Sequence, residues 1–102
     1  MKVFTQSVNF TADKSLIDYI EKKIEGLEKF HDKIVDVEVY LKVQKASEKE
    51  NKITEIKINI PGDEFMVKKQ TKTFEEGVNI VIDSLKRSLK KSKEKQRSTL
   101  VE

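Results

Sequence analysis

Strict alternation of apolar and polar residues in two segments most constrains the fold of this chain. Valine or leucine fills every second position from Val35 to Val43, and isoleucine does so from Ile56 to Ile60. Side chains of a β-strand point alternately to the two faces of a sheet, so a period of two predicts strands with one buried face. The polar residues between them are expected on an open, solvated face, and they include Glu38, Tyr40, Lys42 and Lys57.

Two other segments have the 3.6-residue periodicity of amphipathic helices. The first covers about residues 14–29 and follows Asp13, a residue type that caps helix N-termini. The second opens with a capping box formed by Thr73 and Glu76. Its apolar stripe ends at Leu89, after which polar residues stand where apolar ones should recur. We therefore expect packing to stop there and the basic end of the helix to project outward.

Two further strands are expected, at residues 3–10 and from Phe65 to about residue 71, the latter after a Pro61-Gly62-Asp63 turn signal. The inward face of the first strand stays open between two sets, Val3 with Thr5 or Phe4 with Val8 and Phe10. The element order is then β-α-β-β-β-α. A right-handed crossover makes the first two strands parallel, and an antiparallel meander follows. The predicted fold is a two-layer α+β domain in which a four-stranded mixed sheet carries both helices on one face.

Positive charge is concentrated in one stretch of the chain. The 102 residues have a formal net charge of +3, but the stretch from Asp83 to Arg97 alone carries +5, which leaves −2 elsewhere. A basic patch on a near-neutral body suits a polyanionic partner, although a solvated, lysine-rich helix end explains the composition equally well. On helical wheels of the last helix, Lys86, Lys90, Lys93 and Arg97 lie on one flank of the apolar stripe, and Arg87, Lys91 and Lys95 lie on the other. Lys22 and Lys29 lie together on the outer face of the first helix.

If the helices lie side by side, these residues can merge into one positive surface. No aromatic pair interleaves with them in the sequence, which argues against a stacking platform for single strands. Lysine-rich surfaces of this kind contact phosphates rather than base edges. The sequence therefore predicts a structured RNA recognised by its shape and backbone.

The residue types that are missing exclude most catalytic chemistry. Cysteine is absent, so disulfides, thiolate ligands and thiol nucleophiles are excluded. The one histidine, His31, is expected to make a favourable contact with the C-terminal dipole of the first helix. No transition-metal ligand set or glycine-rich phosphate loop can be assembled. We predict no enzyme, cofactor, metal or small-molecule substrate. No apolar run approaches the roughly 20 residues that span a bilayer, so a cytoplasmic protein without a membrane partner is expected.

Four segments carry a family resemblance. They are 16–24 with Leu27-Glu28-Lys29-Phe30, the strand Ile34-Val35-Asp36-Val37-Glu38-Val39, the Pro61-Gly62 turn, and the closing stretch 82–91. Together they resemble, over about residues 1–95, the ribosome hibernation-promoting factors, also called the ribosome-associated inhibitor or S30EA family. The resemblance implies a ribosome-binding α+β domain over 1–95, and we expect 96–102 to be a flexible C-terminal tail.

The resemblance also implies a function. Such proteins bind the decoding region of the bacterial small ribosomal subunit, contact 16S rRNA, exclude mRNA and tRNA, and stabilise inactive, hibernating ribosomes under stress or in stationary phase. The family's RNA-binding positions correspond to Lys22, Lys23, Lys29, Arg87 and Lys91, and the charge argument alone adds Lys86, Lys90 and Lys95. Gly26 and Ser84 depart from the family, because both stand at commonly basic positions. The chain resembles the short form, whose pairing of ribosomes would need a second hibernation factor or a surface of its own.

Three alternatives were weighed against this interpretation. A double-stranded RNA-binding domain shares the α-β-β-β-α core, but it lacks the first strand and has lysines where Thr73–Gly77 is acidic. An acylphosphatase-type enzyme needs an arginine in an N-terminal loop, whereas the arginines here are Arg87 and Arg97. A protein-interaction module that uses the open sheet face stays open.

Overall fold

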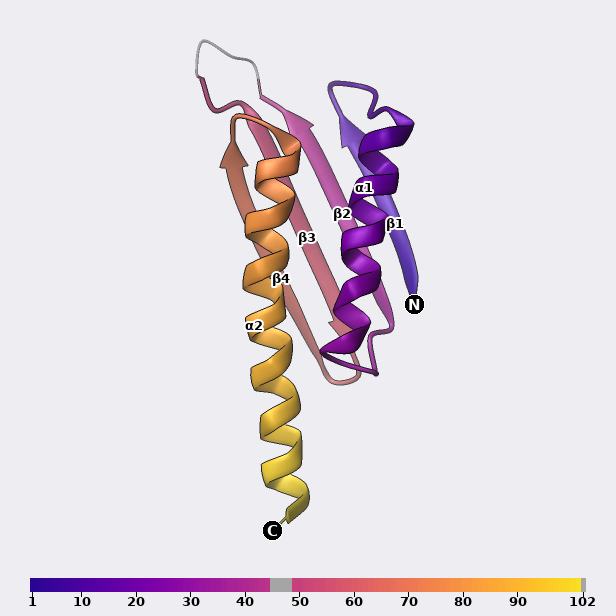
Figure 1. Cartoon of the computed structure of the whole chain (residues 1–102), viewed down its shortest axis with the longest axis vertical. Coiled ribbons are helices and arrows are strands. Elements are labelled where there is room, and N and C mark those ends of the chain that lie inside the picture. Colours follow the sequence, from indigo (N-terminus) through magenta and orange to yellow (C-terminus); the bar gives the residue numbers. More distant parts are fainter. Residues whose placement is uncertain (45–48, 102) are drawn as a thin grey trace.

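The computed structural model describes residues 1–44 and 49–101, and for residues 95–101 it describes the backbone alone. Its elements are β1 (Lys2–Val8), α1 (Lys14–Glu25), the short 3₁₀-helix η1 (Gly26–Lys29), β2 (Asp36–Val43), β3 (Lys52–Ile60), β4 (Asp63–Thr71) and α2 (Phe74–Val101), as drawn in Figure 1. The predicted β-α-β-β-β-α order is confirmed.

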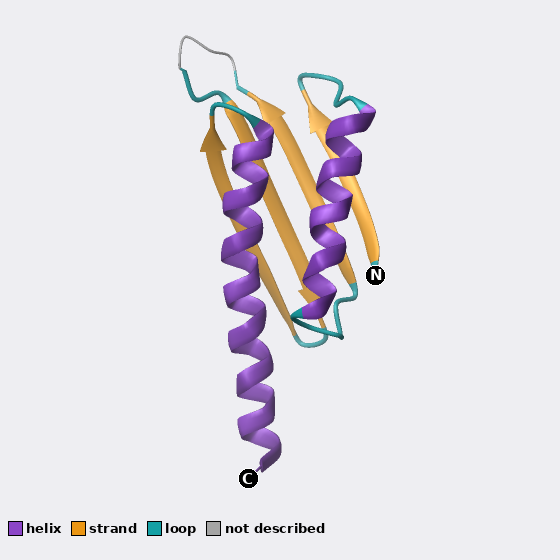
Figure 2. Cartoon of the chain, in the orientation of Figure 1, coloured by secondary structure: helices purple, strands orange, loops and turns teal. Residues whose placement is uncertain are grey.

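The four strands form one mixed sheet in the order β1-β2-β3-β4. β1 runs parallel to β2, and the pairs β2–β3 and β3–β4 are antiparallel. Both helices cover the same face and leave the other bare (Figure 2). The predicted two-layer α+β fold is therefore confirmed.

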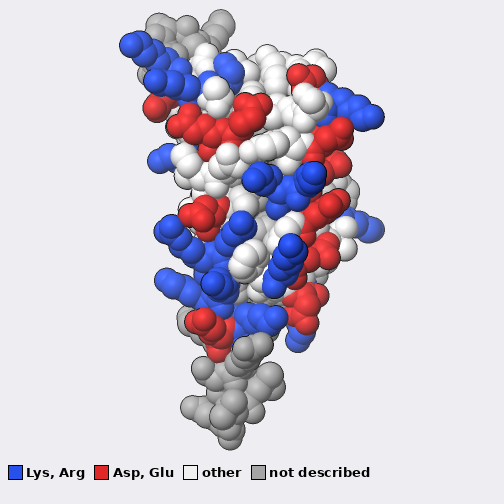
Figure 3. Space-filling model, in the orientation of Figure 1, with Lys and Arg blue, Asp and Glu red and all other residues white. Residues whose placement is uncertain are grey.

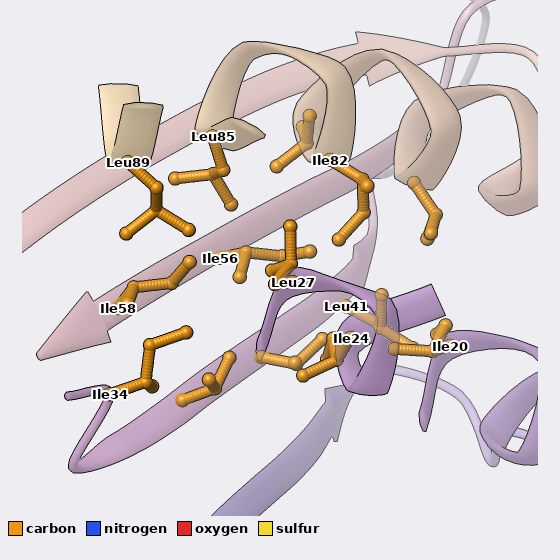
Figure 4. Packing of buried hydrophobic residues seen from close by; sticks show 14 of the residues in the cluster. Ile20, Ile24, Leu27, Ile34, Leu41, Ile56, Ile58, Ile82, Leu85 and Leu89 are labelled. Atoms are coloured by element: carbon orange, nitrogen blue, oxygen red, sulfur yellow. The ribbon is translucent and has the colours of Figure 1, made fainter. Parts of the chain in front are cut away.

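The core lies between the sheet and the two helices (Figure 4). From the sheet, the alternating apolar residues of β2 and β3 enter it, and Val37, Leu41, Ile56 and Ile58 are completely or almost completely buried. From the helices come Ile20, Ile24 and Leu27, facing Val81, Leu85 and Leu89. The period of two in the strands and the period of 3.6 in the helices thus meet in one apolar layer.

The alternating pattern fails at the start of β2. Val35 was expected to begin the buried row, but the strand starts at Asp36 and Val35 is 54% exposed. The Val35 backbone is held at the sheet margin, where its N–H donates to the Asn59 carbonyl at 2.8 Å. Ile34, one residue earlier, is buried in its place.

The structure settles the inward face of β1 in favour of Val3 with Thr5. Val3 packs on the core, whereas Phe4 is 55% exposed on the opposite face. β1 ends at Val8, two residues earlier than expected, because Asn9 adopts a left-handed backbone conformation with φ 67° and turns the chain. Phe10 consequently leaves the strand pattern and stacks on Phe74, with ring centroids 4.8 Å apart.

Both predicted helix caps are present. The Asp13 carboxylate accepts a hydrogen bond from the Leu16 N–H at 2.8 Å, and the Thr73 hydroxyl accepts one from the Glu76 N–H at 3.2 Å. The α-helical part of the first helix is shorter than expected, because it ends at Glu25 and the four residues of η1 continue it as a tighter turn. The change begins at Gly26, a residue type with low α-helix propensity.

The turn between β3 and β4 is confirmed at Pro61–Gly62, where Gly62 has φ 81°, a backbone conformation that favours glycine. β3 begins at Lys52 and β4 at Asp63, so both strands are longer than predicted. Residues 45–48 of the expected loop lie outside the described residues.

α2 continues as a helix to Val101, into the segment expected to be a flexible tail. The side chains from residue 95 onward lie outside the described residues, and the flexibility of 96–102 stays a prediction. Within the part of the chain that the structure describes, no helix is long and apolar enough to cross a membrane.

We predict that Gly77→Ala destabilises the fold by about 1–3 kcal/mol, because an added Cβ would overpack the contact between α2 and the sheet. This Cβ would lie 2.6 Å from the Thr54 hydroxyl oxygen and 2.9 Å from that of Thr71. The second hydroxyl is tied down, since it donates to the Thr73 carbonyl at 2.6 Å.

Gly26→Ala is the matched control. A Cβ there meets nothing within 4 Å, and the backbone is right-handed with φ −62°. We expect this variant to be stabilised by about 0.4–1 kcal/mol, because alanine restricts the unfolded chain more than glycine does. Urea unfolding of both variants measures the difference, and equal stabilities would contradict the close approach of α2.

Candidate nucleic-acid interface

In the described part of α2, the stripe of buried apolar residues ends at Leu89. Its buried residues recur at helical spacing up to that position, and among residues 90–94 none is fully buried. The basic residues flank the end of the apolar stripe: Lys86 and Lys93 are half-buried, and Arg87, Lys90 and Lys91 are exposed. Lys95 also lies in α2, but its side chain lies outside the described residues.

Phe30 joins this basic stretch to the end of the first helix. It follows Lys29, the last residue of η1, and its ring is half-buried. The ammonium nitrogens of Lys86 and Lys90 lie 5.5 and 5.9 Å from the centre of that ring. Both distances are within the range of cation–π attraction. Two basic residues of α2 therefore meet an aromatic side chain that directly follows the end of η1.

Tyr19 forms a second link between the helices. Its hydroxyl donates to the side-chain oxygen of Asn79 on α2 at 2.8 Å, and its ring lies 5.6 Å from the ammonium nitrogen of Lys23. Lys22, Lys23 and Lys29 are all exposed. The predicted basic residues of the first helix are thus accessible, and Lys23 is held on the side that carries the link to α2.

The other flank of α2 is more open. Arg87 pairs with Asp83, one helical turn earlier, at 3.0 Å, and its side chain is 76% exposed. An exposed ion pair contributes only about 0–1 kcal/mol, so this guanidinium can exchange its carboxylate for a phosphate at little cost. Lys91, one turn further along, is also exposed.

The positive surface has a sharp boundary on α1. Figure 3 shows basic side chains gathered over the lower half of α2 and acidic ones in a column along the far side of α1. The acidic residues at that spacing are exposed, and they are Asp18, Glu21, Glu25 and Glu28. The surface is therefore a strip between the helices and along α2, narrower than the broad surface expected from the two helical wheels.

Two aromatic residues lie beside the basic ones, which the sequence interpretation did not include. Phe30 and Tyr19 both contact predicted lysines, three of them in all. Two signals in the sequence point to them: Tyr19 and Lys23 are one helical turn apart, and Phe30 directly follows Lys29. Their rings support the lysines from below rather than standing free to stack on bases.

His31 does not make the expected contact with the helix dipole. The ring is 1% exposed, and its Nδ1 accepts a hydrogen bond from the Lys33 N–H at 3.1 Å. The imidazole therefore acts as an acceptor that holds the turn after η1, and a neutral ring carries its proton on Nε2. Across residues 1–44 and 49–94, no group of three or more His, Asp or Glu side chains is placed to hold a metal ion.

The two family departures lie in this region. Gly26 stands at the junction of α1 and η1, and Ser84 is half-buried on α2. Neither contributes charge to the strip. Lys86 and Lys90, which were added from the charge argument alone, are the two cations that contact Phe30.

Comparisons with known proteins converge on one family. A family model described as sigma 54 modulation protein / S30EA ribosomal protein matches residues 3–97. A ribosome hibernation promoting factor of Pseudomonas putida is 33% identical over 100 residues, which covers 98% of this chain and 94% of the relative. The protein of the same name from Azotobacter vinelandii is 33% identical over 82 residues, covering 80% of this chain and 73% of that protein.

Two solved structures share the fold. A ribosomal subunit interface protein of Coxiella burnetii superposes with a TM-score of 0.80 at 18% identity, covering 91% of this chain and 98% of the other. The N-terminal domain of Thermus thermophilus Protein Y superposes with a TM-score of 0.70 at 22% identity, with 88% and 93% covered.

A double-mutant cycle tests the contact around Phe30. We predict that Phe30→Leu and Lys90→Met couple by about 0.5–1 kcal/mol in the free energy of unfolding, because each removes one partner of a cation–π contact. The control is Lys91→Met, which removes an equally exposed charge away from the ring. A coupling with Lys91 as large as that with Lys90 would contradict the assigned geometry.

Proposed function

Because the chain belongs to the sigma 54 modulation protein / S30EA ribosomal protein family, we propose that it binds the decoding region of the bacterial small ribosomal subunit and keeps that subunit inactive. The family makes it a ribosome-binding protein of the hibernation class and not an enzyme. The region bound, the contact with 16S rRNA and the exclusion of mRNA and tRNA are the parts that we propose.

The observation that carries the proposal is the junction at Phe30. The ring gathers Lys86 and Lys90 of α2, so a strip of cations on α2 begins beside the end of η1, which carries the exposed Lys29. Such a strip can follow a phosphate backbone, and each cation that neutralises a phosphate releases a bound counterion. The positions carried over from the family add five exposed cations, of which Arg87 and Lys91 lie on the other flank of α2; the five are Lys22, Lys23, Lys29, Arg87 and Lys91. Lys95 stays a candidate on its place in α2 alone.

The shape of the molecule supports binding in a channel. Its principal extents are 54 × 24 × 18 Å, and the long dimension is that of α2, whose 28 residues span about 42 Å. A narrow rod with cations along one side can lie lengthwise between RNA walls. Occupancy of that space excludes mRNA and the anticodon arms of tRNA by competition, without making or breaking a bond.

The acidic start of α2 argues against the double-stranded RNA-binding module. Glu75 and Glu76 are exposed in its first turn, where a helix N-terminus would otherwise attract phosphate. We place the protein in the cytoplasm with its ribosomal partner and without a cofactor. Pairing of ribosomes with the help of a second hibernation factor stays a prediction.

Co-sedimentation with purified small subunits tests the function. We expect saturable binding that weakens as salt rises, because phosphate contacts release counterions, and that competing tRNA displaces. A salt series and a tRNA titration measure the two effects. Absence of binding at low salt would refute the proposal, and binding that tRNA leaves unchanged would move the site away from the decoding region.

Charge reversal tests the assigned residues. We predict that Arg87→Glu with Lys91→Glu abolishes binding and leaves the fold intact, since both side chains are exposed and face no buried partner. The matched control reverses two exposed lysines on the bare sheet face, Lys42→Glu with Lys68→Glu, and should bind as the wild type does. Unchanged binding by the folded Arg87–Lys91 variant would refute the site.

A further inference from the structure

The bare face of the sheet carries ordered rows of side chains. Cross-strand pairing aligns residues from all four strands, in the order β1, β2, β3 and β4. Three successive rows are Lys2, Asp36, Asn59 and Glu64; Phe4, Glu38, Lys57 and Met66; and Gln6, Tyr40, Glu55 and Lys68. We call these three rows the open face.

The inner part of the open face is held in place by its own contacts. Lys57 pairs with Glu64 at 3.3 Å and with Glu38 at 3.7 Å. The Glu38 carboxylate also accepts a hydrogen bond from the Tyr40 hydroxyl at 3.3 Å. The pKa of Lys57 is raised above its ordinary value. The largest causes are the hydrogen bond with Glu64 and the negative charge of Glu64, followed by the negative charge of Glu38. These charges are present and oriented before any partner arrives.

The outer strands add two apolar side chains to the same row. Phe4 on β1 is 55% exposed and Met66 on β4 is 61% exposed, which makes them the most exposed large apolar residues among the described positions. They stand at opposite ends of the row that has Glu38 and Lys57 at its centre. Across the sheet, this row therefore has an apolar residue on β1, an acidic one on β2, a basic one on β3 and an apolar one on β4.

From this pattern we infer that the open face binds the open face of a second copy of the chain, related by a two-fold axis parallel to the strands. Such an axis keeps each row opposite itself and reverses the strand order, so β1 faces β4 of the other copy and β2 faces its β3. Phe4 then meets Met66, and Glu38 meets Lys57. Both contacts occur twice, as a two-fold interface requires.

The neighbouring rows are complementary under the same axis. In the first row Lys2 meets Glu64, and Asp36 meets Asn59. In the third row the Tyr40 hydroxyl meets Glu55. A two-fold axis perpendicular to the strands does worse, because it places each strand opposite itself. Through the second row it brings Glu38 onto Glu38 and Lys57 onto Lys57, and between the second and third rows it places Phe4 over Gln6 and Met66 over Lys68. The next row, Val8, Lys42, Ile53 and Gln70, brings no opposite charges together and marks the end of the complementary area.

The size of the face indicates a weak dimer. Four strands spaced about 4.8 Å apart and five residues rising about 3.3 Å each give a footprint of about 320 Å² per copy. The total of about 640 Å² falls well below the roughly 1,200 Å² of stable interfaces, so the dimer forms only at high protein concentration. Both basic strips stay exposed, because the helices cover the opposite face of each sheet (Figure 2).

Charge exchange between two variants tests the pairing of Glu38 with Lys57. Glu38→Lys gives one chain two lysines at these positions, and Lys57→Glu gives another chain two glutamates. We expect each variant alone to be monomeric, since like charges then face each other, and an equimolar mixture to associate at least as well as the wild type. Sedimentation equilibrium from about 10 μM to about 1 mM measures this, a range suited to a weak interface. A monomeric wild type throughout that range, or a mixture no better than its components, would overturn the inference.

Cross-linking gives a second test that leaves the charged network untouched. The chain has no cysteine, so Phe4→Cys and Met66→Cys each provide one reactive site on an exposed position. With a short bis-maleimide we expect the mixture to give cross-links between residues 4 and 66. Two copies of residue 4 would be separated by three strand spacings, about 14 Å, in the direction across the strands, and we expect them to cross-link poorly. Equal yields of all three products would overturn the two-fold arrangement.

Discussion

Burial of one face of a four-stranded sheet under two amphipathic helices is the constraint on which the rest of this structure depends. The apolar rows of β2 and β3 require an apolar partner, and the stripes of α1 and α2 provide it. Once Ile24, Leu85 and Leu89 point inward, the rotation of each helix is set. Lys86 and Lys90 then emerge at the seam between the helices, where both contact Phe30, and Arg87 and Lys91 emerge on the other flank of α2. Packing in the core thus determines where the positive charge is displayed.

The same constraint gives the molecule two unlike surfaces. The helix side carries a strip of cations next to an acidic column, and it suits a polyanion approached along its length. The bare side of the sheet carries charges of both signs, among which Lys57 pairs with Glu38 and Glu64, and it has an exposed apolar residue at each edge. Its charges nearly balance, which suits a protein surface rather than a nucleic acid. Gly77 contributes to the helix side, since it permits the close approach of α2 to Thr54 and Thr71 on the sheet.

Most of the fold could be predicted from periodicity, because alternation and helical spacing record which face of each element is buried. Errors arose where local geometry outweighed the pattern. Ile34 replaces Val35 in the core because the strand starts one residue later, and Phe10 leaves the pattern of β1 at Asn9. The helical wheels placed the basic residues beside the apolar stripes but carried no information on how close the two helices approach. The role of Phe30 therefore emerged only from the packed structure, as did the burial of His31.

The central claim is that the seam between the helices lies against the RNA of the decoding region. Chemical footprinting of 16S rRNA in small subunits, with and without the protein, tests this claim most directly. The account predicts protected nucleotides on both sides of the channel between the head and the body of the subunit, where mRNA and tRNA bind. Protection confined to another part of the subunit, or none at saturating protein, would contradict it.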